Sequence, residues 1–131
     1  MDKNIELYDH EVITKASGLR LIGFGRYAGI VGAYNGFRAL GKKHRSFDLP
    51  SANSLTGIEA LHAQLAKIEL PALKILLTGT GKVAGGAQEI LHTMGIKKVS
   101  VADYLTKSFK TAVYCKVGVT DYNRRTDGQK P

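Results

Sequence analysis

The 131-residue sequence has one cysteine, Cys115, three prolines and no tryptophan. A single cysteine cannot form an internal disulfide or a structural zinc site, and it favours a reducing, cytoplasmic location. Uncharged stretches are short as well. The longest, residues 27–37, is far below the ~18 apolar residues of a membrane-spanning helix, and the polar, acidic start is unlike a signal peptide. We therefore expect no membrane partner.

Metal-ligand spacing is also missing. No His-x3-His or Cys-x2-Cys pattern occurs, so we predict no metal site. His62 and His92 fall within predicted helices as surface or partly buried groups. Cys115 lies among apolar residues of a predicted strand, and nothing in the sequence indicates the surroundings that stabilise a thiolate. We expect it to be a buried structural thiol.

Acidic residues are absent from residues 20–45, which carry much of the net charge of +8. A basic patch of this kind is compatible with nucleic-acid binding. The basic residues are not interleaved with aromatic residues that stack on bases, and Lys42, Lys43 and Arg45 suit the C-terminus of a helix. We predict no nucleic-acid partner and keep a basic nucleic-acid-binding domain as an alternative.

What is present is the composition of one globular domain, 44% hydrophobic and 23% charged. Residues 5–13 are interpreted as a short strand and a turn, residues 19–25 as a strand that ends at glycine, and residues 27–40 as a helix. Glycine costs a helix about 1 kcal/mol relative to alanine. Gly29, Gly32 and Gly36 share one face of this helix, so they predict close packing against another helix.

Further elements alternate between helix and strand. Thr56 and Glu59 have capping-box spacing and predict the start of a second helix, which Pro71 stops. Residues 72–79 form a short apolar run that predicts a strand buried on both faces. A helix over residues 83–94 and strands over 98–102 and 112–119 follow, and the remaining residues form a polar tail.

The most informative segment joins the strand at residues 72–79 to the next helix. It contains Gly79-x-Gly81-x-x-Ala84, the pattern of a dinucleotide-binding turn. Gly79 would allow the tight turn, and Gly81 would let a diphosphate approach the backbone. Ala84, with the two glycines behind it, would let the helix press on the strand. The free amides and positive dipole end of the helix start would hold the phosphates.

Flanking residues complete this predicted site. Thr80, Lys82 and Val83 belong to the same turn, where Thr80 and Lys82 are placed to meet phosphate oxygens. Asp103 lies 22 residues beyond Gly81, at the predicted end of the next strand, with Tyr104 beside it. An acid there accepts hydrogen bonds from the adenine ribose and favours NAD. Two lysines that follow would weaken this preference, so the expected cofactor is NAD or NADP.

Longer strings carry a family resemblance. TGTGKVAGGAQEI (residues 78–90) resembles the glycine-rich loop of lysine-ketoglutarate reductases and lysine-forming saccharopine dehydrogenases. Residues 18–41 resemble the segment before the nucleotide domain of that family, and residues 113–128 the stretch after its second Rossmann strand. The family is related to alanine dehydrogenase and nicotinamide nucleotide transhydrogenase, so an alanine dehydrogenase-like enzyme stays an alternative.

The resemblance implies an NAD(P)-dependent oxidoreductase acting on the CH–NH group of amino acid donors. A hydride would pass between the nicotinamide and an imine carbon formed from an amino acid and a 2-oxo acid. The family's acid/base lysine and histidine lie in an N-terminal domain with no matching segment here, so no catalytic residue is assigned. Arg26 is expected to meet a substrate carboxylate, with a surface ion pair as the alternative.

The expected fold is α/β, a partial Rossmann-like three-layer domain with a parallel sheet and a preceding glycine-rich linker helix. Residues 1–45 would supply an inter-domain strand and crossover helix, and residues 46–131 the first half of the NAD(P)-binding domain. A full domain has about six strands, so we expect a truncated, inactive fragment. Its open sheet edge predicts a homo-oligomer. A non-catalytic nucleotide-binding or regulatory module is the remaining alternative.

Overall fold

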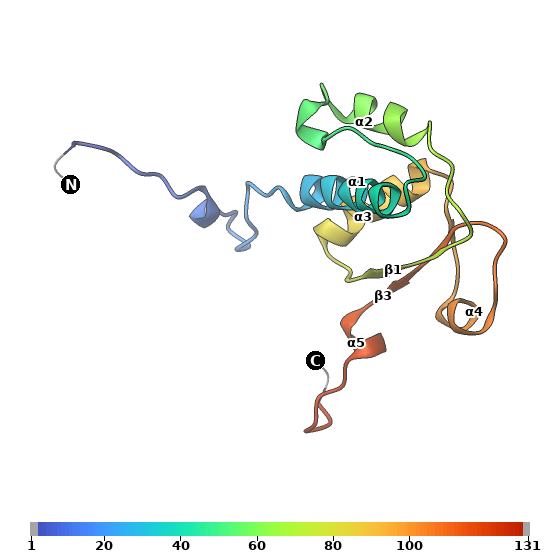
Figure 1. Ribbon diagram of the computed structural model, residues 1–131. Helices are drawn as coiled ribbons and strands as arrows, with labels where there is room; N and C mark the ends of the chain where they lie inside the picture. The colour runs from blue at the N-terminus through green and yellow to red at the C-terminus, as the bar shows by residue number, and fades with distance from the viewer. Residues whose placement is uncertain (1–2, 130–131) are drawn as a thin grey trace.

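The computed structural model describes residues 3–129 and has helices on both faces of a parallel sheet (Figure 1). The strands are β1 (Lys74–Thr78), β2 (Lys97–Lys98) and β3 (Val113–Val117), in the order β1-β3-β2. The α-helices are α1 (Gly25–His44), α2 (Ile58–Leu65), α3 (Lys82–Thr93), α4 (Val101–Thr106) and α5 (Val119–Tyr122). The predicted α/β, partial Rossmann-like fold is confirmed.

The core lies between α1, α3 and one face of the sheet. Tyr34 of α1, Ile90 of α3 and Tyr114 of β3 are fully buried and belong to one cluster. Leu61 and Leu65 of α2 close this cluster from above. The buried hydroxyl of Tyr34 donates to the carbonyl of Pro50 at 2.9 Å, so burial leaves it satisfied. Cys115 is also buried, as predicted.

Helices α1 and α3 touch backbone to backbone. A Cβ on Gly29 would lie 1.9 Å from the carbonyl oxygen of Val83, and one on Gly86 would lie 1.9 Å from that of Arg26. Close helix packing is therefore confirmed at Gly29. It is wrong at Gly32 and Gly36, where a Cβ would meet nothing within 4 Å. Gly86 serves this helix contact rather than helix–strand packing.

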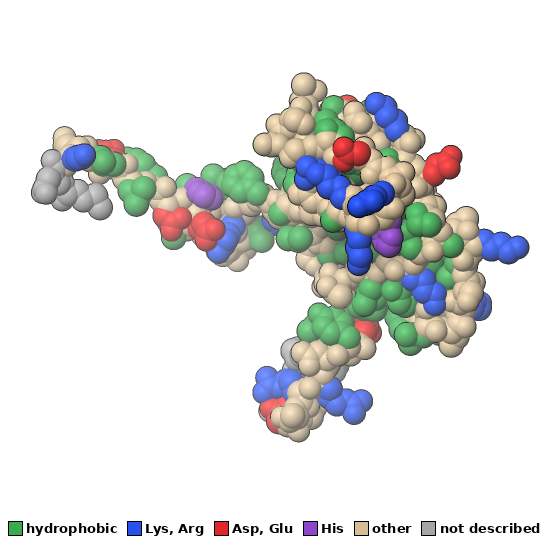
Figure 2. All heavy atoms as spheres, viewed as in Figure 1, with side chains coloured by type: hydrophobic (Ala, Val, Ile, Leu, Met, Phe, Trp, Pro, Cys, Tyr) green, Lys and Arg blue, Asp and Glu red, His purple; other side chains and the backbone are tan. Residues whose placement is uncertain are grey.

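Residues 3–24 form an arm that stands away from the body (Figures 1 and 2). The strands predicted within residues 5–13 and over residues 19–25 are wrong. The arm holds a single bridge between Thr14 and Arg20 and one 3₁₀ turn, His10–Val12. Leu7 and Tyr8 are about four-fifths exposed. An isolated hairpin without a third strand or a packing surface is marginal in water, which explains the missing strands.

The strand β1 is half-buried on one face and exposed on the other. Ile75 and Leu77 turn toward α1 and α3, whereas Leu76 on the other face is 52% exposed. The prediction of a strand buried on both faces is therefore wrong. The predicted capping box is also wrong, because α2 begins after Gly57 and has no side-chain cap.

The predicted strand over residues 98–102 is replaced by the two-residue strand β2 and helix α4. The hydroxyl of Ser100 accepts a hydrogen bond from the amide of Asp103 at 3.1 Å and caps this helix. That local bond competes with extended pairing and ends the strand at Lys98. Between residues 3 and 129 no helix combines the length and apolar character needed to cross a bilayer.

Candidate functional site

The glycine turn joins β1 to α3 at the carboxyl edge of the sheet. Gly79 has a backbone φ of +94°, a conformation that residues with a Cβ rarely adopt. Its amide donates to the carbonyl of Val117 at 2.8 Å, which ties the turn to the end of β3. The Cβ of Ala84 would lie 3.8 Å from a Cβ on Gly79, so the helix starts close to the strand.

The start of α3 presents unpaired amides. Gly85 donates the first intrahelical bond to Gly81 at 3.0 Å, so the amides of Lys82, Val83 and Ala84 have no acceptor within the helix. A Cβ on Gly81 would meet nothing within 4 Å. The backbone is therefore open to a ligand at the residue where the motif requires it. These groups fit the diphosphate of a dinucleotide by charge and by access.

Lys82 and Thr80 flank this opening on different sides. The side chain of Lys82 lies toward the start of α1, with its Nζ 3.9 Å from a Cβ on Gly23. The methyl group of Thr80 lies 3.7 Å from a Cβ on Gly118, the residue after β3. The structure thus gathers residues 79–84 around one opening. Their roles toward a cofactor stay predictions.

Asp103 and Tyr104 do not join this group. They lie on α4, and the ammonium of Lys74, the first residue of β1, donates to the Tyr104 carbonyl. The turn follows the last residue of β1, about 16 Å away along the strand. Figure 1 shows α4 at the end of the sheet opposite α5. Asp103 is not at a strand end, which corrects that expectation, and its ribose-binding role stays a prediction.

The carboxylate of Asp103 is engaged locally. It forms an ion pair with Lys107 at 2.7 Å, one helical turn onward. The hydrogen bond from Lys107 lowers the pKa of Asp103 below its ordinary value. This i,i+4 pair and the position in the first helical turn are typical of an acid that stabilises a short helix.

Asp121 is the acid at the turn's edge of the sheet, and sequence analysis missed it. It lies in α5, directly after β3, and its carboxylate accepts from the amide of Gly118 at 2.7 Å. The signal was present in the sequence as an acid three residues after a glycine at the end of a strand. The sequence instead predicts a polar tail for this segment, which is wrong at Asp121.

Arg26 is held by an ion pair. Its Nη2 and Nε donate to the two carboxylate oxygens of Glu89 at 2.6 and 2.8 Å, joining α1 to α3. This bond raises the pKa of Arg26 and lowers that of Glu89. The arrangement matches the alternative of a surface ion pair. Binding of a substrate carboxylate by Arg26 stays a prediction and would require release from Glu89.

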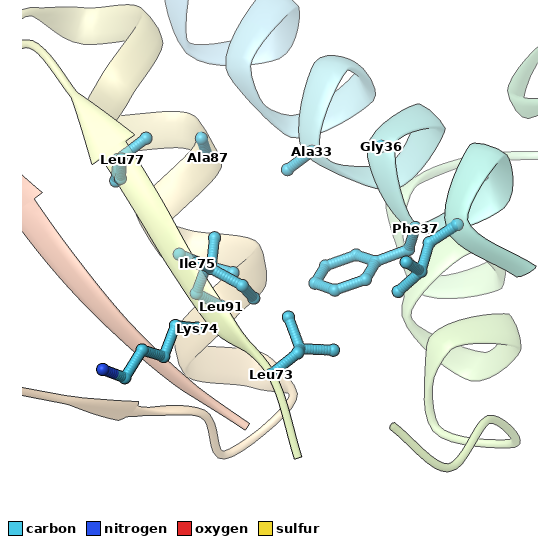
Figure 3. A pocket seen from close by; sticks show the side chains of 10 residues that line it. Ala33, Gly36, Phe37, Leu73, Lys74, Ile75, Leu77, Ala87 and Leu91 are labelled. Carbon is cyan, nitrogen blue, oxygen red and sulfur yellow. The ribbon is translucent and has the colours of Figure 1, made fainter. Parts of the chain in front are cut away.

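A cavity of about 460 Å³ lies between α1, β1 and α3 (Figure 3). Its walls are apolar, with Phe37, Ile75 and Leu91 among them. The Lys74 ammonium points away from the other side chains. Without converging polar groups this cavity cannot hold a diphosphate. Among residues 3–129 no three His, Cys, Asp or Glu side chains are grouped to hold a metal ion.

Three relatives match most of this sequence. The mouse "alpha-aminoadipic semialdehyde synthase, mitochondrial" is 29% identical over 98% of the chain, and the rat protein of that name is 28% identical over 86%. The Arabidopsis thaliana "alpha-aminoadipic semialdehyde synthase" is 26% identical over 72%. The chain is similar to alpha-aminoadipic semialdehyde synthases. The predicted resemblance to lysine-ketoglutarate reductases and saccharopine dehydrogenases is thereby confirmed.

The chain spans only a small part of these synthases. It covers 16% of the mouse protein, 15% of the rat protein and 10% of the Arabidopsis protein. No protein-family model matches the chain. The similarity to the synthases therefore supports a saccharopine dehydrogenase-like domain. It does not extend to the activity of the complete synthases, because the match covers only a small part of them.

Proposed function

We propose that this chain is an NAD(P)-binding domain of a saccharopine dehydrogenase-like oxidoreductase acting on the CH–NH group of amino acid donors. The observation that carries the proposal is the turn at Gly79–Gly81. A positive φ, an open backbone at Gly81 and three free amides coincide at the start of α3. When bound, the dinucleotide would supply the chemistry of hydride transfer, and this chain would bind its diphosphate.

Replacement of Gly81 by alanine tests this function. Gly81 has φ of −82°, which alanine adopts freely, and its Cβ would meet no protein atom within 4 Å. The variant should therefore fold normally and place a methyl group where the diphosphate approaches. We expect NADH and NADPH to bind at least about tenfold more weakly in calorimetric titrations, a loss of about 1.4 kcal/mol.

Gly32→Ala is the matched control, because Gly32 lies in α1 and also has open space around its Cα. This control should bind both dinucleotides like the wild-type chain. Failure of the wild-type chain to bind either dinucleotide would contradict the proposed function. Equal affinity of the Gly81→Ala variant and the control would contradict the assignment of the turn.

The substrates and surroundings are further proposals. An amino acid and a 2-oxo acid are the expected substrates, and a homo-oligomer the expected assembly. A cytoplasmic location remains our proposal from the single cysteine, while the rat and mouse relatives are named mitochondrial. Steady-state assays of this chain with lysine, 2-oxoglutarate and NAD(P)H should show no turnover, because the resemblance places the family's acid/base lysine and histidine in a domain with no matching segment here.

A further inference from the structure

The strand order places the end of β3 beside the glycine turn, whereas the sequence indicated the end of the strand predicted over residues 98–102. In a doubly wound domain the second strand pairs with the first, and its terminal acid meets the ribose. Here β3 occupies that position, because it pairs in parallel with β1 along its whole length, from Lys74 with Val113 to Thr78 with Val117. The strand β2 lies at the outer edge.

The carboxyl end of β3 contacts the turn directly. Gly79 donates to the carbonyl of Val117, and the methyl group of Thr80 is 3.7 Å from a Cβ on Gly118. Ligands of open α/β sheets bind outside the carboxyl ends of the strands. A dinucleotide with its diphosphate at Gly81 would therefore extend its adenosine over the end of β3.

An acid is held at this strand end. The Oδ2 atom of Asp121 accepts from the amide of Gly118 at 2.7 Å, while the amide of Asp121 donates to the carbonyl of Gly118 at 3.1 Å. This pair of bonds folds the carboxylate back onto the end of β3. Within residues 3–129 its other oxygen, Oδ1, has no hydrogen-bond or ion-pair partner. The residue is exposed, so a ligand can reach it.

We propose that Asp121 binds the adenine-ribose hydroxyls of the dinucleotide and makes the site selective for NAD(H) over NADP(H). This inference rests on the proposed function of the turn. The carboxylate accepts hydrogen bonds from two ribose hydroxyls but repels the 2′-phosphate of NADP(H). In this proposal Asp121 takes the role that the sequence indicated for Asp103, whose helix is attached to the opposite end of β1 and whose carboxylate is paired with Lys107.

The test compares Asp121→Asn with Asp103→Asn in the full chain. Both changes remove one negative charge from an acid in the first turn of a short helix; Asp121 is exposed and Asp103 is half-buried. Asparagine keeps a side-chain oxygen for the Gly118 amide, so α5 should survive, and far-UV circular dichroism checks this. Calorimetric titrations with NADH and NADPH then give two affinities for each protein.

We expect Asp121→Asn to weaken NADH binding at least about tenfold and to leave NADPH binding equal or tighter. Asp103→Asn should change neither affinity, and Asp121→Glu should keep the preference for NADH. Equal weakening of both dinucleotides by Asp121→Asn, or no change, would overturn the inference, as would selective loss of NADH binding in Asp103→Asn.

The proposed function fails separately from this inference. If the wild-type chain binds NADH and Gly81→Ala weakens it, the turn is established whatever Asp121 does. In that case an indifferent Asp121→Asn variant overturns only the ribose assignment. If the wild-type chain binds neither NADH nor NADPH, both the proposed function and the role of Asp121 are overturned.

Discussion

Replacement of Gly86 by alanine should destabilise the domain through the contact between α1 and α3. The new Cβ would lie 1.9 Å from the carbonyl oxygen of Arg26, and non-bonded Cβ atoms essentially never come within 3.0 Å of another heavy atom. The obstacle is backbone, which cannot rotate away as a side chain can. The two helices would therefore separate by roughly 1 Å, enough to lose a quarter to a half of each dispersion contact.

The size of the effect follows from two opposing terms. Overpacking a core costs about 1–3 kcal/mol, and a backbone obstacle belongs at the upper end. Alanine returns about 1 kcal/mol relative to glycine through its higher helix propensity. The free energy of unfolding should thus fall by about 2 kcal/mol. Ile30 and Ile90, which are buried near this contact, would lose packing in the same step.

Gly85→Ala is the control, since Gly85 is the neighbouring residue of α3 and its Cβ would meet nothing within 4 Å. It should gain up to about 1 kcal/mol, so the two alanine variants should differ by about 3 kcal/mol. With a urea m-value of about 2 kcal/mol/M, their midpoints would lie about 1.5 M apart. Superimposed urea curves, followed by far-UV circular dichroism, would refute the backbone contact.

Three further outcomes are expected. The hydrogen bond from Arg26 lowers the pKa of Glu89, so this ion pair stabilises the folded chain only while Glu89 is ionised. The wild-type chain should therefore be more stable than Glu89→Gln above pH ~4.3, and this difference should disappear as the pH falls through the lowered pKa. Thermal melts that show an unchanged difference at low pH would contradict this. Ser100→Ala removes the cap of α4 and should lower the free energy of unfolding, measured by chemical denaturation, by about 1 kcal/mol. An unchanged denaturation midpoint would show that the cap does not stabilise the fold. The open edge of β1 and the apolar arm predict self-association, which light scattering would disprove with a 14.2 kDa particle at high concentration.

Helices α1, α2 and α3 could be predicted because their signals are local. Apolar spacing and the glycine that follows place α3 at Lys82–Thr93, within a residue of the predicted bounds of 83–94. The failure at β2 is local too. The pattern Ser100-x-x-Asp103 is a helix-start signal, and it outweighs the strand preference of Val99 and Val101.

The site could be predicted only as far as the turn itself. The positive φ of Gly79 follows from the motif, because its chemistry is contained in a few consecutive residues. The neighbour of β1 could not be predicted, since strand pairing joins residues about forty positions apart and no local pattern specifies it. For that reason the sequence indicated Asp103, whereas the strand order brings Asp121 to the turn.

The glycine contacts between α1 and α3 also determine where the molecule can bend. Backbone packed on backbone has no rotamers that could absorb a displacement, and the ion pair of Arg26 and Glu89 adds a second tie. A rotation of the arm must therefore take place before Gly25, where Gly18 and Gly23 lie and one bridge holds the chain. Beyond that point α1 and α3 are joined by backbone contact and an ion pair and would move as one unit, so a rotation of the arm is absorbed before it reaches the free amides at the start of α3.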